Sequence, residues 1–154
     1  MIETVSFSST TYAPLPMKFE AGTQNFNAVP TLVPALDFAE AVRVDKDVQA
    51  QQKAIVDYLY AQLTRNPQIV LYGTAREAKI PLFSFAVNGV HHEDLALILD
   101  KMGIAVRSGQ MCAEPLMDYL GVTGLVRVSF APYNTLEEAK YFMKSLNKAI
   151  EMLI

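Results

Sequence analysis

The spacing of apolar and polar residues separates an irregular beginning of the chain from a region of regular elements. Residues 2–8 alternate between apolar and polar and predict a strand. Residues 9–30 contain Pro14, Pro16 and Pro30 among scattered apolar positions and predict no compact element. Because so long an irregular stretch is unusual inside a small domain, we expect an arm that packs on something outside this chain.

Two helices are expected next, over residues 31–42 and 46–65. Apolar residues recur along both at the spacing of one helix face, and Pro67 ends the second helix. We expect both faces to be buried. Their members are Leu32, Leu36 and Ala39 in the first helix, and Val48, Ile55, Leu59 and Leu63 in the second.

Short strands and helices alternate from residue 69 onwards. Ser108 and Gly109 predict a turn, and Thr135 with Glu138 has the spacing of a capping box that starts a last helix. These elements predict an α+β fold class, one sheet with helices packed on it. The predicted strands are residues 69–72, 82–87, 104–107 and 125–130, and the predicted helices are residues 92–102 and 114–120.

Composition narrows the functional classes. Hydrophobic residues make up 51% of the 154 residues and charged residues 19%, which supports a packed core. The net charge of −3 and the lack of a basic run argue against a nucleic-acid or membrane partner. No secretory signal or bilayer-length apolar run is evident, so we expect a soluble, cytoplasmic protein. His91 and His92 stand at a helix start, where we expect capping, and no metal site is expected.

Cys112, the only cysteine, is the first candidate for chemistry. It lies in a turn between a predicted strand and a predicted helix, where functional side chains are often displayed. Pro115 marks the first turn of that helix, and a helix N-terminus or a nearby arginine such as Arg107 favours the reactive thiolate. A lone cysteine is otherwise a small buried apolar residue. The residues alone leave the reactive and the structural interpretation open.

Two further residues allow both a binding and a structural interpretation. Arg127 lies inside an apolar strand, where its guanidinium either faces outward from the polar side or grips a carboxylate with two hydrogen bonds. Thr23 follows Gly22 in a flexible segment that either binds a phosphate through N–H and hydroxyl groups or forms a plain turn. Local spacing does not decide either case.

Four segments occur in a characteristic order along the chain. They are Phe-Glu-Ala-Gly-Thr-Gln-Asn at residues 19–25, Val-His-His-Glu-Asp-Leu at residues 90–95, the stretch at residues 103–117 that includes Arg107 and Cys112, and the stretch at residues 127–138. Together they resemble the C-terminal part of SUF-type cysteine desulfurases and selenocysteine lyases, class V members of the fold-type I aminotransferase superfamily. The resemblance covers essentially the whole chain.

The resemblance implies a reaction. In that family pyridoxal 5′-phosphate (PLP) activates L-cysteine, and a protein thiolate takes its sulfur, which leaves alanine and an enzyme persulfide for iron–sulfur cluster assembly. By this resemblance Cys112 is the catalytic sulfur acceptor, Arg127 binds the substrate carboxylate, and Arg107 lies beside the nucleophile in the substrate site. Thr23 matches a residue that contacts the PLP phosphate of a neighbouring subunit. A sulfur-acceptor protein and a homodimer are the implied partners.

The resemblance also implies a domain organisation. Residues 1–30 would be the end of a large PLP domain and a dimer-facing arm, and residues 31–154 a small C-terminal domain with a short, mostly antiparallel sheet. The Schiff-base lysine of the family has no match here, so we expect a fragment that is inactive alone and does not hold PLP covalently. Gln110-Met111 replaces a His-His pair found in many relatives, and Lys18 replaces an arginine.

Two other functions stay open at this point. The chain could be a stand-alone persulfide carrier or protein-interaction module, and the parent enzyme could be a selenocysteine lyase.

Overall fold

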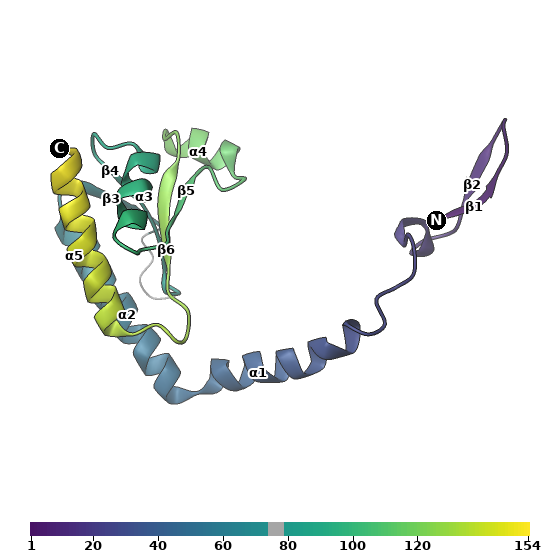
Figure 1. Cartoon of the computed structure of the whole chain (residues 1–154), viewed down its shortest axis with the longest axis horizontal. Coiled ribbons are helices and arrows are strands. Elements are labelled where there is room, and N and C mark those ends of the chain that lie inside the picture. The colour runs from purple at the N-terminus through teal and green to yellow at the C-terminus, as the bar shows by residue number, and fades with distance from the viewer. Residues whose placement is uncertain (74–78) are drawn as a thin grey trace. The chain divides into compact units, whose positions relative to one another are not determined.

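The computed structural model describes residues 1–73 and 79–154, in two compact units (Figure 1). The first unit is Met1–Ala41 and the second is Val42–Ile154. The division falls within helix α1 (Leu32–Val44), whereas the sequence placed a boundary at residue 30. That the earlier part belongs to a large PLP domain stays a prediction.

The first unit begins with a hairpin. Strands β1 (Ile2–Val5) and β2 (Thr10–Tyr12) pair antiparallel. The N–H of Ser6 donates to the carbonyl of Ser9 over 2.8 Å, and the Ser6 hydroxyl accepts from the Ser9 N–H over 3.1 Å. The prediction that residues 9–30 hold no regular element is therefore wrong at β2, because threonine and tyrosine suit a strand once this serine turn returns the chain.

The rest of the first unit is helical in short pieces. It contains the 3-10 turns η1 (Met17–Phe19) and η2 (Val29–Thr31) and then helix α1. No residue of α1 is buried, so the predicted inward face of Leu32 and Leu36 is exposed within its own unit. Four phenylalanines of this unit are exposed as well, Phe7, Phe19, Phe26 and Phe38.

The second unit is built on a four-stranded sheet. Its strands are β3 (Ile69–Tyr72), β4 (Leu82–Val87), β5 (Arg107–Gly109) and β6 (Leu125–Ser129), in the order β3-β4-β6-β5, and every neighbouring pair is antiparallel. The predicted α+β fold class, with a short antiparallel sheet and packed helices, is confirmed.

Strand β5 begins later than predicted. The sequence placed a strand over residues 104–107 and a turn at Ser108-Gly109, but the pairing with β6 runs over Arg107–Gly109. Gly103, with a φ of +77°, follows the end of the preceding helix, and the Ile104 N–H donates to the Leu99 carbonyl over 3.0 Å. Ile104 therefore completes a Schellman cap and is unavailable for the sheet.

Four helices accompany the sheet: α2 (Lys46–Arg65), α3 (His92–Lys101), α4 (Glu114–Leu120) and α5 (Leu136–Leu153). Asp45 caps α2 by accepting from the N–H groups of Asp47 and Val48. The predicted capping box at the start of α5 is confirmed, because Thr135 and Glu138 each bond the other's backbone N–H. No helix in the described ranges is long and apolar enough to cross a membrane.

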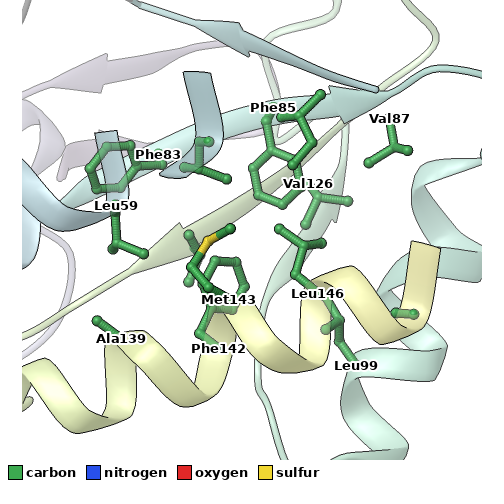
Figure 2. Close-up of a cluster of buried hydrophobic side chains, with 14 of the residues drawn as sticks. Leu59, Phe83, Phe85, Val87, Leu99, Val126, Ala139, Phe142, Met143 and Leu146 are labelled. Carbon is green, nitrogen blue, oxygen red and sulfur yellow. The ribbon is translucent and has the colours of Figure 1, made fainter. Parts of the chain in front are cut away.

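The core lies on one face of the sheet. Figure 2 shows Phe83, Phe85 and Val87 of β4 facing α5, where Phe142 and Leu146 point toward them. The rings of Phe85 and Phe142 meet edge to face with centroids 6.4 Å apart. Strand β4 alternates strictly between buried and half-buried residues. Its other residues therefore face the opposite side, together with Arg127 of β6.

Candidate active site

A row of polar side chains crosses the face of the sheet opposite the core. Tyr72 of β3 is in register with Ser84 of β4, Ser84 with Arg127 of β6, and Arg127 with Arg107 of β5. Register partners on neighbouring antiparallel strands point to the same face and lie about 5 Å apart. The sheet therefore brings together Arg107 and Arg127, which are twenty residues apart in the sequence.

Arg127 is the central member of this row. Its side chain is half-buried, and its Nε is fully buried without a hydrogen-bond partner in the part of the chain that the structure describes. A buried guanidinium donor without an acceptor costs free energy unless a ligand supplies one. Arg107 lies directly opposite, and like charges in this position destabilise a sheet. The pair is thus suited to an anion with the planar, two-oxygen geometry of a carboxylate.

The turn that carries Cys112 connects β5 to α4. The Ala113 N–H donates to the Gln110 carbonyl over 3.0 Å, and Cys112 is exposed. Met111 and Cys112 have φ angles of 56° and 60°, in the left-handed region that residues with a side chain rarely adopt. Strained backbone of this kind clusters at functional sites. The exposed thiol argues against the interpretation of Cys112 as a buried structural residue.

A pocket of about 490 Å³ joins these two features, and this volume is typical of small-molecule sites. Arg127 lines the pocket, and so do Met111 and Ala113, the two neighbours of Cys112. The other described lining residues are Tyr72, Gly73, Lys79, Leu82, Ser84, Gln110, Leu116, Met117, Leu120 and Leu125. The turn of Cys112 and Arg127 therefore border one cavity.

Thr23 is not part of this pocket. It lies in the first unit, is exposed, and follows Gly22, whose φ of +79° gives the local bend. A hydroxyl in such a bend can contact a phosphate.

The two histidines differ in their surroundings. His91 caps α3, since its Nδ1 accepts from the Glu93 N–H over 3.4 Å, and the predicted capping role is confirmed. His92 is half-buried, and its Nδ1 is buried without a partner among the described residues. Burial, followed by the neighbouring His91, lowers the pKa of His92.

The sequence matches the family model described as aminotransferase class-V over residues 1–142. The chain belongs to this family. Among class-V relatives, a probable cysteine desulfurase of Vibrio cholerae is 40% identical over 99% of this chain and 37% of that protein. A cysteine desulfurase of Haloferax volcanii is 35% identical over 99% of this chain and 35% of that protein.

Solved structures agree with the class-V assignment. The crystal structure of the cysteine desulfurase CsdA (S-sulfonic acid) from Escherichia coli has a TM-score of 0.77 and 34% identity, over 100% of this chain and 38% of that one. The apo cysteine desulfurase of Thermococcus onnurineus NA1 has a TM-score of 0.75 and 34% identity, over 99% and 38%. The predicted family resemblance is confirmed. The chain spans little more than a third of the length of these relatives.

The pocket also contains residues that the sequence analysis did not identify as candidates. Strand register brings Tyr72 and Ser84 to the pocket, and Lys79 reaches it from the segment that leads into β4. Alternation along residues 82–87 could have put Ser84 on the polar face. Its neighbours there, however, come from β3, the preceding strand, and from β6, which is distant in the sequence.

Proposed function

We propose that this chain supplies the sulfur-accepting cysteine and the substrate-binding arginines of a PLP-dependent cysteine desulfurase. The observation that carries the proposal is the shared pocket, which is lined both by Arg127, whose Nε is buried without a partner among the described residues, and by the two neighbours of Cys112. The family membership and the relatives named cysteine desulfurases support the same reaction class.

Each residue has a defined task in this proposal. The guanidinium of Arg127, with Arg107 in register beside it, binds the carboxylate of L-cysteine by charge-assisted hydrogen bonds. That contact fixes the substrate so that its sulfur can meet the exposed thiolate of Cys112. The Cys112 sulfur bonds to the substrate sulfur, the electron pair of the carbon–sulfur bond passes to the carbon, and a proton completes alanine. Cys112 is left as a persulfide.

PLP, when bound, supplies the electron sink that lets the carbon–sulfur bond break. The residues of this chain fit part of that cofactor's needs. Thr23 presents an exposed hydroxyl for the phosphate beside the bend at Gly22. Lys79 lines the pocket, but its Nζ donates to the Gly73 carbonyl over 2.8 Å. We propose that the covalent attachment of PLP lies outside these 154 residues and that this chain alone is inactive.

Partners follow from the same proposal. The persulfide on the exposed Cys112 would be passed to a sulfur-acceptor protein for iron–sulfur cluster assembly. The parent would act as a homodimer in which Thr23 reaches the PLP phosphate of the other subunit. The exposed phenylalanines of the first unit support an arm that is covered by other parts of the assembly.

The test uses the longer PLP-containing protein with Cys112→Ala. Alanine and sulfide formation from L-cysteine should be lost while PLP stays bound, as followed by its absorbance. Arg127→Met should raise the KM for L-cysteine, and Ser129→Ala, an exposed residue on the same sheet face, is the matched control. Alanine formation at the unaltered rate in the Cys112→Ala protein would refute the role of Cys112.

A persulfide carrier is a second candidate, because the exposed thiol belongs to a unit with its own hydrophobic core. Incubation of the 154-residue chain with a low-molecular-weight persulfide and intact-mass analysis tests it. A stable persulfide on Cys112 that transfers to a second thiol protein favours the carrier. A chain that remains unmodified excludes it.

A further inference from the structure

Lys79 brings a second cation to the pocket of Arg127. It is half-buried and precedes β4, and its Nζ lies 4.8 Å from the centroid of the Phe83 ring. The hydrogen bond to the Gly73 carbonyl uses one of the three donors of the ammonium. The Phe83 ring and the Gly73 carbonyl both contact the ammonium, and these contacts restrict it to a position at the pocket.

The charges of the described residues that line this pocket are unbalanced. None of the described lining residues of the pocket is an aspartate or a glutamate, whereas two are cations and Tyr72 and Ser84 add hydroxyl groups. Burial lowers the pKa of Lys79, because desolvation disfavours the charged ammonium. Arg107 continues the positive row on β5. The described part of the cavity is therefore positive at two points, and nothing among its lining residues neutralises it.

We propose that Lys79 and Arg127 form a two-cation subsite that prefers a small anion with two acidic groups over one with a single acidic group. The inference rests on the proposed function for the role of Arg127 and adds the role of Lys79. A single carboxylate on Arg127 leaves the ammonium of Lys79 without a counter-charge among the described lining residues. A second acidic group of the same ligand supplies it, and charge-assisted hydrogen bonds in a partly enclosed site are the strong ones.

The hydroxyl groups of Ser84 and Tyr72 add hydrogen-bond donors to the two cations of the subsite. Ser84 is in register with Arg127 on one side and with Tyr72 on the other, so donors follow one another across the sheet from β6 to β3. Neighbouring strands lie about 4.8 Å apart, so one small ligand can reach the Ser84 hydroxyl while it binds Arg127. The cavity of about 490 Å³ accommodates a molecule of that size.

The test measures binding of succinate and of acetate to the 154-residue chain by NMR titration at constant ionic strength. Wild-type protein should bind succinate about tenfold or more tightly than acetate, since one charge-assisted hydrogen bond contributes on that order. Lys79→Met should weaken succinate binding about tenfold and leave acetate binding unchanged. Lys79→Arg keeps the charge and should keep the preference.

Controls separate this inference from the proposed function. Lys144→Met removes the same charge from the exposed side of α5 and should leave both affinities unchanged. Arg127→Met should weaken the binding of both probes. Succinate binding by Lys79→Met at wild-type strength, with both probes lost in Arg127→Met, overturns the role of Lys79 and leaves the proposed function standing. Acetate binding that survives Arg127→Met removes Arg127 from the site and overturns both.

Discussion

Gly124 is the position where a single added methyl group has the most direct predicted effect. It is buried next to the start of β6, and an added Cβ would overlap Nε2 of His92, with His92 Cδ2 at 2.7 Å and the Gly109 Cα at 2.9 Å. Real Cβ atoms essentially never approach other atoms so closely. Either the His92 ring or the β5 backbone must therefore move.

Gly124→Ala should lower the free energy of unfolding by about 1–3 kcal/mol, the usual cost of overpacking a filled site. The assay is urea unfolding of the full chain, followed by tyrosine fluorescence because the protein has no tryptophan. Combining Gly124→Ala with His92→Ala should recover part of the loss, since the smaller side chain leaves room for the methyl group. A double-mutant cycle measures this coupling.

Gly89→Ala is the matched control for this cycle. A Cβ at Gly89 meets nothing within 4 Å, but its φ of +76° makes the substitution strained. His92→Ala should therefore give no recovery in combination with Gly89→Ala. Purely additive effects of Gly124→Ala and His92→Ala would refute the clash with the His92 ring, because the loss would then not depend on that side chain.

Two other predictions concern titration and capping. Because burial holds the pKa of His92 below its ordinary 6.5, the unfolded chain binds the proton more tightly, and the free energy of unfolding should decrease as the pH falls below about 6.5. Urea unfolding between pH 5 and 8 checks this, and His92→Gln should flatten the dependence that this residue contributes. Thr135→Ala removes one half of the capping box and should cost about 1 kcal/mol, visible as a lower urea midpoint, whereas Thr135→Ser should retain the cap. An equal loss in both variants would contradict the capping argument.

Local signals in the sequence located most elements of the second unit. The bounds of α2 and α4 follow from apolar periodicity together with Pro67 and Gly121. The capping box needs only Thr135 and Glu138, which are three residues apart, and it was placed correctly. These features depend on residues that are close in the sequence, so they can be predicted from a short segment of it.

Features that depend on distant partners were harder to predict. Ile104 has the apolar character of a strand residue, but its N–H closes the cap of α3. The face of Leu32 and Leu36 has helical spacing and yet is exposed within its own unit. The apolar character of these residues favours burial, but it does not specify which surface would bury them.

The pocket shows the same distinction. Cys112 and Arg127 stood out because their residue types are unusual in their surroundings. Lys79 did not stand out, because a lysine before a strand is ordinary, and its importance comes from lying in the same cavity as Arg127. Lys79, just before β4, and Arg127, in β6, reach the same cavity because these two strands pair in antiparallel register. This pairing joins Ser84 to Arg127 across a long connection in the sequence.

The turn between β5 and α4 also sets how far its thiol can travel. Only residues 110–113 separate Gly109 in the sheet from Glu114 in the helix, and an extended chain covers at most about 3.5 Å per residue. Such a short tether, with the left-handed backbone at Met111 and Cys112, keeps the sulfur atom close to one spot. A molecule that reacts with this sulfur must therefore bind at the surface around Cys112. Different reactants must bind at that same surface one after another.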